Sequence, residues 1–400
     1  MSRKDGLDLA DERESILASV GAAVPAILPF IAGISILLGA AIKIGLTEQQ
    51  TASWLLALWV LPGILTVTFT LRTRQPLLFT GNIFALIFVS SLGDRLPFAE
   101  IVFASMLAGA GVVIVGATGL SRAIARWIPV PVVMGLLAGA ILPYISGIFT
   151  SVGDQPVLVG GTLVAYVLSR RLLGSRISPI IPALVVGLLI AAIAGQYGNL
   201  PESVPLPKPG FVMPAVSVEA ITTAVPILMI LVVLQSNVPS IIFLKNEGYE
   251  PPDRLIDGLS GLATIAGSLF GPATISLSLP ATSLVASEHA GYPSTRYRVA
   301  CTVGVAMLAV AILSGAATLL PSLAPTSLLL SVAGLAMVDI LIGALKRVID
   351  GPTPVGPFFA FAVAASDITL FGFGRFFWAL ILGTLTYHVF RQVGSKLESR

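Results

Sequence analysis

Cysteine and histidine, which build many metal centres and catalytic sites, are nearly absent from this sequence. Its 400 residues include one cysteine, Cys301, and two histidines, His289 and His388. A single cysteine cannot form an internal disulfide, and so few thiol and imidazole groups cannot make a zinc cluster. The spacings typical of zinc proteases, serine hydrolases and P-loop proteins are missing as well. We therefore expect no metal and no cofactor, and the sequence disfavours an enzyme.

Charged residues are also scarce. Asp, Glu, Lys and Arg make up only 11% of the chain, whereas soluble proteins carry about 25%. Hydrophobic residues make up 56%, and the mean hydropathy is +0.95. A chain of this composition has too few polar groups to cover itself in water, so lipid must solvate most of it. The sequence predicts an all-α polytopic membrane protein surrounded by membrane lipid.

Apolar runs recur along almost the whole chain and divide into two groups of seven. The first group comprises residues 16–42, 51–71, 76–92, 98–120, 128–149, 156–173 and 179–194. The second comprises residues 220–244, 255–270, 272–287, 299–320, 326–345, 354–371 and 376–390. These runs predict fourteen transmembrane segments in two seven-segment repeats, 16–194 and 218–390. A proline-rich connection, 195–217, joins the repeats, and short polar tails, 1–15 and 391–400, flank them.

Basic residues support this count because they alternate between the predicted loops. Of the 23 Lys and Arg residues, only four fall on one side of the membrane: Lys43, Arg95, Lys208 and Arg375. Positive charge is retained on the cytoplasmic side. We therefore expect both tails in the cytoplasm and the 195–217 connection outside. The alternation also accounts for the pI of about 9.1 without a nucleic-acid partner.

The third and tenth segments do not resemble simple helices. Residues 76–92 would span about 26 Å as a helix, which is less than the ~30 Å hydrocarbon core, and their middle reads Thr80-Gly81-Asn82. Residues 274–279 alternate polar and apolar side chains, as extended backbone does, before Pro280. We predict a short strand followed by a half-helix in each, with Thr80 or Asn82 capping the first. The alternative is a distorted helix whose Ser and Thr side chains bond to their own backbone.

An odd number of segments per repeat inverts the second repeat relative to the first. The two half-helices would then point their N-termini at each other near the middle of the membrane. Helix N-termini offer partial positive charge and unpaired N–H groups, which suit an anion. We therefore predict an anion pocket formed by Thr80, Gly81, Asn82, Ser276, Ser278 and Leu279.

Other polar and aromatic residues are candidates for the same pocket. Gln235, Ser236 and Asn237 in the eighth segment could orient a ligand, although such side chains also bond between helices. Phe30 and Phe84 could form an apolar wall, although aromatic residues in a helical bundle usually only pack.

A carboxylate inside a membrane segment costs free energy, so such a residue is a candidate for a function. Asp339 lies within the twelfth segment and could carry a proton, but a neighbouring basic residue could equally neutralise it. Asp257 lies nearer to a segment end, and we expect it to be solvated or structural.

A further set of motifs extends along most of the chain. It includes Leu71-Arg72-x-Arg74-x-Pro76, Arg170-Arg171-Leu172, Asn237-x-Pro239, Gly248-Tyr249-x-Pro251-Pro252 and Arg296-Tyr297. Together these motifs resemble the benzoate:proton symporter family. The resemblance implies the fold shared by nucleobase and sulfate permeases, with a core domain of segments 1–4 and 8–11 and a gate domain of segments 5–7 and 12–14. It also suggests a homodimer formed through gate helices and a place in the bacterial inner membrane.

The resemblance further implies uptake of an aromatic carboxylate together with protons. Our leading hypothesis is a proton-coupled transporter of a small organic anion, with benzoate or a related aromatic carboxylate as substrate. A nucleobase or inorganic-anion transporter of the same fold is one alternative, and an uncoupled channel or facilitator is another.

Overall fold

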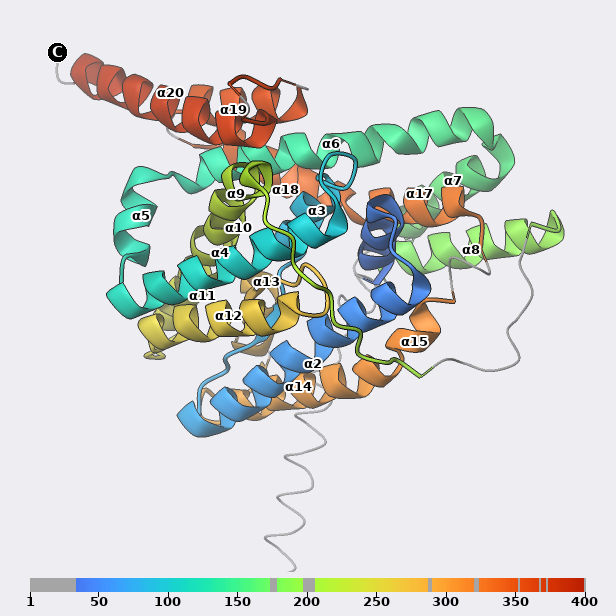
Figure 1. Cartoon of the computed structure of the whole chain (residues 1–400), viewed down its shortest axis with the longest axis horizontal. Helices are drawn as coiled ribbons and strands as arrows, with labels where there is room; N and C mark the ends of the chain where they lie inside the picture. The colour runs from blue at the N-terminus through green and yellow to red at the C-terminus, as the bar shows by residue number, and fades with distance from the viewer. Residues whose placement is uncertain are drawn as a thin grey trace, which may run out of the picture.

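The computed structural model describes residues 34–172, 178–196, 206–286, 290–319, 324–351, 353–366, 368–371 and 373–398. Phe30 and the tail 1–15 lie outside the described residues. Helices dominate the described chain (Figure 1). The described residues also contain one two-stranded sheet.

Helices of the first half overlap the predicted apolar segments, although residues 16–33 of the first segment lie outside the described residues and α5 falls in a predicted loop. They are Ile34–Ile44, α2 (Glu48–Thr73), α3 (Ile83–Ser90), α4 (Phe98–Thr118), α5 (Ser121–Trp127), α6 (Val130–Asp154), α7 (Pro156–Leu172) and α8 (Ile180–Ile193). Local sequence explains where α2 begins, because Thr47 and Gln50 form a capping box: the Thr47 hydroxyl accepts from the Gln50 N–H, and the Gln50 side chain accepts from the Thr47 N–H.

Helices of the second half are more often interrupted. They are α9 (Val218–Thr223), α10 (Val225–Ile230), η1 (Leu231–Asn237), α11 (Val238–Asn246), α12 (Asp253–Ser268), α13 (Leu279–Ala286), α14 (Arg296–Ile312), α15 (Ser314–Ala317), α17 (Thr326–Ala336), α18 (Val338–Ile349), α19 (Val355–Ala365) and α20 (Arg375–Glu398). The π-helix η1 ends two residues before Pro239. Because proline has no N–H to donate to the carbonyl of Gln235, the regular hydrogen-bond pattern cannot continue there.

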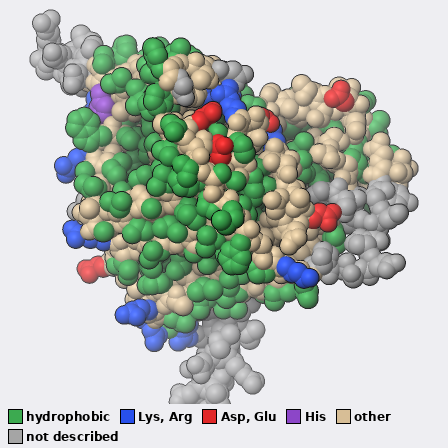
Figure 2. Space-filling view, viewed as in Figure 1, with side chains coloured by type: hydrophobic (Ala, Val, Ile, Leu, Met, Phe, Trp, Pro, Cys, Tyr) green, Lys and Arg blue, Asp and Glu red, His purple; other side chains and the backbone are tan. Residues whose placement is uncertain are grey.

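Several helical stretches are long and apolar enough to cross a membrane. In the described residues these are Glu48–Thr73, Phe98–Thr118, Val130–Asp154, Val218–Asn246 and Thr326–Ile349. Large hydrophobic side chains lie on the surface, including Leu172, 75% exposed, and Ile193, 89% exposed. Figure 2 shows hydrophobic side chains covering much of one face, with Lys and Arg mostly toward its edges. The expectation of an integral membrane protein is therefore supported by both length and surface.

The short sheet joins the two halves of the chain. Strand β1 (Phe79–Gly81) precedes α3, and strand β2 (Ile275–Leu277) precedes α13. The strands are antiparallel, with Thr80 opposite Ser276. Residues 79–81 and 275–277 thus lie side by side and bring the first turns of two eight-residue helices together.

Threonine hydroxyls form hydrogen bonds with the backbone groups on the two outer edges of this isolated strand pair. The Thr66 hydroxyl of α2 accepts from the Phe79 N–H (2.9 Å) and donates to the Phe79 carbonyl (3.2 Å). On the other edge, Thr264 of α12 accepts from the Ile275 N–H (3.0 Å). Because unpaired backbone groups are costly in a membrane interior, these threonines stabilise extended backbone there.

Close packing of small residues fixes the surrounding helices. Helix α4 packs against α12, α2 against α14, and α6 against α19. A Cβ on Gly109 would lie 2.9 Å from the Gly261 carbonyl oxygen, and one on Gly139 would lie 2.7 Å from the Phe361 carbonyl oxygen. Glycine therefore allows these helix backbones to touch, as small residues do in membrane bundles. In Figure 1, α6, α19 and α20 lie along the top and α2 and α14 along the bottom.

Candidate functional site

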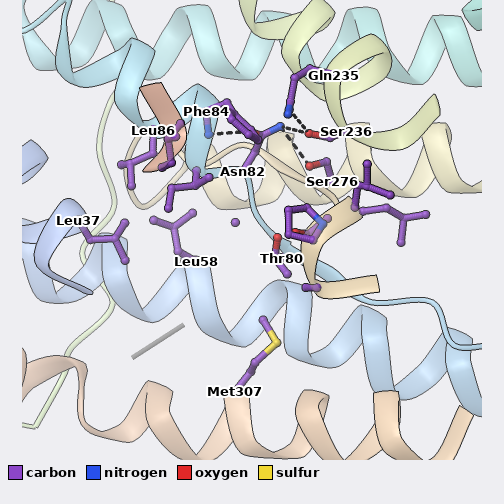
Figure 3. Close-up of a pocket in the computed structure, with 18 of the residues that line it drawn as sticks. Leu37, Leu58, Thr80, Asn82, Phe84, Leu86, Gln235, Ser236, Ser276 and Met307 are labelled. Carbon is purple, nitrogen blue, oxygen red and sulfur yellow. Dashed lines mark hydrogen bonds between the residues drawn. The ribbon is translucent and has the colours of Figure 1, made fainter. Parts of the chain in front are cut away.

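A cavity of about 460 Å³ lies where the two half-helices begin. This volume lies within the range of about 300–1,000 Å³ for small-molecule sites. Its wall comes from Ile34–Ile44, α2, β1, α3, η1, β2, α13, α14 and α18. Figure 3 shows Asn82, Gln235, Ser236 and Ser276 gathered together, with Leu58 and Met307 below them and Phe84 and Leu86 to one side. The cavity therefore has one polar and one apolar side.

The N-termini of α3 and α13 both open into this cavity. Ile83 and Leu279, the first residues of these helices, line it. The N–H of a first helical residue has no acceptor within its own helix. Pro280 follows Leu279 and has no N–H, so it adds no competing donor. The cavity thus offers two backbone N–H groups from helix N-termini, an arrangement that favours an anion.

Asn82 organises the polar side. Its Oδ1 caps α3 by accepting from the N–H groups of Phe84 and Ala85, both at 3.1 Å. Its Nδ2 donates to Ser236 Oγ (3.0 Å) and Ser276 Oγ (3.1 Å). Because Asn82 already caps Phe84 and Ala85, the N–H of Ile83 is the donor of this helix that is left for a ligand. Asn82 thereby positions the site, and sequence analysis did not single out Ile83.

Gln235 and Ser236 extend the polar wall from η1. The Ser236 hydroxyl donates to Gln235 Oε1 at 2.6 Å. The Gln235 Nε2 has no hydrogen-bond partner among the described residues, and Gln235 lines the cavity. Its amide can therefore donate to an oxygen of a ligand.

The remaining predicted contact residues surround the strand ends. Thr80, Gly81 and Ser278 line the cavity with Ser276 and Leu279, and Phe84 lines its apolar side with Leu37, Leu58 and Met307. Ser278 also bonds backbone to backbone with Leu78 (3.3 Å), which extends the strand pair by one residue. Phe30, the other predicted aromatic contact, lies outside the described residues.

Asn237 lies behind the strand pair and does not line the cavity. Its Oδ1 accepts from the Leu277 N–H (2.9 Å), and its Nδ2 donates to Asp257 Oδ1 (2.9 Å) and Ser260 Oγ (3.2 Å). Asn237 is fully buried and Asp257 is 1% exposed. The sequence offered Asn237 either as a ligand contact or as a bond between helices, and Asp257 as either solvated or structural. The structure favours the second alternative for both, because Asn237 bonds to β2 and α12 without lining the cavity and Asp257 is buried.

Asp339 lines the cavity at the break between α17 and α18. Its Oδ1 accepts a hydrogen bond from Arg170 Nη2 at 2.6 Å, and its side chain is 62% exposed. Arg170 also donates to the Tyr166 hydroxyl (2.9 Å). Asp339 is therefore at an open edge of the cavity and has the basic partner that we considered as one alternative.

A further set of contacts links α6 to the C-terminal end of α3. The Tyr144 hydroxyl of α6 donates to Ser90 Oγ, the last residue of α3. Lys43 Nζ lies 4.2 Å from the centre of the Tyr144 ring, within the range of a cation–π interaction. These contacts tie α6 to α3 on the side of the half-helix remote from the cavity.

Comparisons with known proteins identify the family of this chain. A family model described as "Benzoate membrane transport protein" matches residues 13–389. This chain belongs to the benzoate membrane transport protein family. It is 27% identical to the inner membrane protein YdcO of Escherichia coli over 375 residues, covering 92% of this chain and 95% of that protein. It is 23% identical to the benzoate membrane transport protein of Acinetobacter baylyi over 381 residues, covering 94% and 95%.

Solved structures with a similar fold include anion transporters. The transmembrane domain of the cyanobacterial bicarbonate transporter BicA matches with a TM-score of 0.55 at 12% identity, covering 94% of this chain and 97% of that one. Murine Slc26a9, an anion transporter in the inward-facing state, matches with a TM-score of 0.59 at 14% identity, covering 93% and 68%. The benzoate transport family member described here is thus a membrane transporter with their fold, and not an enzyme.

Proposed function

We propose that this protein carries benzoate or a related aromatic carboxylate into the cell together with protons. The observation that carries the proposal is the pair of half-helix N-termini at Ile83 and Leu279, which open into one half-apolar cavity. The carboxylate would accept from these two N–H groups and from Gln235 Nε2. The ring would pack against Phe84 and Leu58. The family and the relative from Acinetobacter baylyi support the substrate class.

The proposal includes the topology read from the sequence. Fourteen segments in two inverted repeats would place both termini in the cytoplasm of a bacterium, with the third and tenth segments as strand plus half-helix. Segments 1–4 and 8–11 would form the core domain and the others the gate domain, which would also mediate a homodimer. In this topology the open edge at Asp339 faces the cytoplasm and the Tyr144 contact closes the outside.

Proton coupling requires a group that can bind and release a proton. The sequence made Asp339 the candidate carrier. Its position in the cavity wall supports that role, whereas its ion pair with Arg170 supports the simpler role of charge neutralisation. Transport by the Asp339→Asn variant decides between the two.

Uptake of radiolabelled benzoate into proteoliposomes tests the function directly. Empty liposomes are the control, because benzoic acid crosses lipid unaided. Saturable, protein-dependent uptake that an inward proton gradient stimulates would support the proposal. Flux that does not saturate and ignores the gradient would identify a channel, and the absence of uptake by folded protein would exclude benzoate as the substrate. Competition by bicarbonate or uracil would then test the inorganic-anion and nucleobase alternatives.

A further inference from the structure

A buried carboxyl group lies directly behind the strand pair, and no step above uses it. Asp257 is in the second turn of α12 and is 1% exposed. Its Oδ1 accepts from Asn237 Nδ2 at 2.9 Å. Its Oδ2 is also buried and has no hydrogen-bond partner of normal geometry among the described residues. The Ser121 hydroxyl at the start of α5 is close enough to stabilise the ionised carboxyl group, but it makes no hydrogen bond of normal geometry with Oδ2.

An unpaired buried carboxylate oxygen calls for a physical explanation. Leaving a charged oxygen without a donor is expensive in a protein interior, and native structures largely avoid it. Asp339 differs, because Arg170 already pairs with it and solvent reaches it. Oδ2 of Asp257 is therefore a buried carboxyl oxygen with an open position for a proton, on a group that pairs with no cation among the described side chains.

Asp257 is connected to the cavity through a short chain of hydrogen bonds. Asn237 links the Asp257 carboxyl to the N–H of Leu277 in β2, with both hydrogen bonds at 2.9 Å. Ser276 and Ser278, on either side of Leu277, line the cavity. A change at Asp257 thus reaches the strand that carries the proposed anion site through one intervening side chain.

The charged residues nearest to Asp257 in α12 are Asp253 and Arg254, and both have other contacts. Asp253, one turn earlier in α12, pairs with Lys245 of α11 at 2.7 Å, and the Arg254 guanidinium lies next to Gly119 at the end of α4.

Few other ionisable residues belong to the elements packed against Asp257. Helix α5 carries Arg122 and Arg126. The titratable residue of α4, Glu100, is in its first turn, whereas α4 approaches Asp257 near Gly116. Neither η1 nor β2 contains a titratable residue. Within the described side chains, no cation forms an ion pair with Asp257.

We propose that Asp257, rather than Asp339, binds the co-transported proton, and that Asn237 couples this proton to substrate binding. This inference rests on the proposed function. An ionised Asp257 and a bound carboxylate would lie on the two sides of β2, and two like charges in a medium of low dielectric constant repel each other. A proton taken from water at Oδ2 removes one of these charges. Protonation therefore strengthens benzoate binding, and benzoate binding strengthens protonation by the same factor.

The Asp257→Asn variant tests this coupling because it keeps the shape of the side chain and removes its proton site. Two assays are compared in proteoliposomes: exchange of labelled for unlabelled benzoate without a gradient, and accumulation driven by an inward proton gradient. We expect the variant to retain exchange, to lose gradient-driven accumulation, and to bind benzoate with an affinity that no longer depends on pH. Asp154→Asn, at the exposed end of α6, is the matched control and should retain all three properties.

The outcomes separate this inference from the function on which it rests. Wild-type protein that neither exchanges nor accumulates benzoate refutes both. Wild-type protein that accumulates benzoate on a proton gradient, with Asp257→Asn doing the same, refutes only the role of Asp257. Accumulation by wild-type protein on a sodium gradient alone also refutes it.

A spectroscopic measurement covers the case in which Asp257→Asn does not fold. Benzoate binding to wild-type protein, followed by infrared difference spectroscopy, should produce the C=O band of a newly protonated carboxyl group. The band should persist in Asp339→Asn. Its absence from the wild type, or its loss in Asp339→Asn, would overturn the assignment.

Discussion

Asn82 and Ser276 are 194 residues apart in the chain, yet the Asn82 amide donates a hydrogen bond of 3.1 Å to the Ser276 hydroxyl. This bond joins the first half-helix to the second strand. Asn82 also caps α3, so one side chain fixes both a helix N-terminus and the wall of the cavity. The geometry of the proposed anion site therefore depends on Asn82, although the polar atoms of Asn82 already form hydrogen bonds within the protein.

Replacing Asn82 by Ala should weaken both the fold and the site. The substitution removes an N-cap, worth about 1 kcal/mol, and leaves buried partners unpaired at about 1–3 kcal/mol each. We expect the melting temperature to fall by several degrees and benzoate to bind about tenfold more weakly or worse. Thermal unfolding and equilibrium binding measure the two effects. Asn246→Ala, exposed at the end of α11, should change neither.

Thr66 should stabilise β1 through its hydroxyl alone. Thr66→Val keeps the shape but leaves the N–H and carbonyl of Phe79 unpaired, at a cost of about 1–3 kcal/mol. Thr68→Val is the matched control, because Thr68 is exposed and its hydroxyl bonds only to carbonyls of its own helix. A thermal unfolding curve should shift down for Thr66→Val and stay in place for Thr68→Val. Equal shifts of the two melting curves would show that the hydrogen bonds from Thr66 to the Phe79 backbone do not stabilise β1.

The Tyr144 to Ser90 contact should favour the conformation seen here. Tyr144→Phe removes the hydroxyl that links α6 to α3, so the outward-open state should become more populated. A cysteine placed at Ser91, which is buried next to this contact, should then react faster with an impermeant maleimide applied outside. All variants should also carry Cys301→Ala, so that the introduced cysteine is the one that is labelled. Tyr292→Phe, at an exposed position, is the control. Unchanged labelling would show that this contact does not hold the outside closed.

Asp339 should contribute little to proton coupling. Asp339→Asn breaks an exposed ion pair, and such pairs contribute about 0–1 kcal/mol to the free energy of unfolding. The variant should therefore fold as the wild type does. We expect its benzoate uptake to keep the pH dependence of the wild type. Uptake measured across a series of external pH values checks this, and loss of the dependence would restore Asp339 as the carrier.

Local sequence signals anticipated part of this architecture. The alternation over 274–279 indicated extended backbone, and a strand occupies Ile275–Leu277. Asn82 was one of two predicted caps for the following helix, and it is the N-cap. Both features depend on residues close together in the chain, where spacing alone carries the information.

Such local signals could not predict contacts between residues that are far apart in the sequence. Asn237 looked like a ligand contact because nothing in its neighbourhood shows that Leu277, 40 residues later, takes its Oδ1. Asp257 looked close enough to a segment end to be solvated or structural, and the local sequence does not show that α4 packs over it through Gly116 and Gly258. The partner of Asp339, Arg170, is 169 residues earlier. Each of these depends on tertiary packing.

The central claim is that the N-termini of α3 and α13 hold a negatively charged carboxylate. Displacement of radiolabelled benzoate from purified protein by unlabelled benzoate or benzamide tests it most directly, because benzamide keeps the ring and loses the charge. Hydrogen bonds to charged groups contribute about 1.5–3 kcal/mol, so benzamide should need at least a roughly tenfold higher concentration. Displacement by benzamide at the same concentration as benzoate would show that the helix N-termini do not recognise the anion.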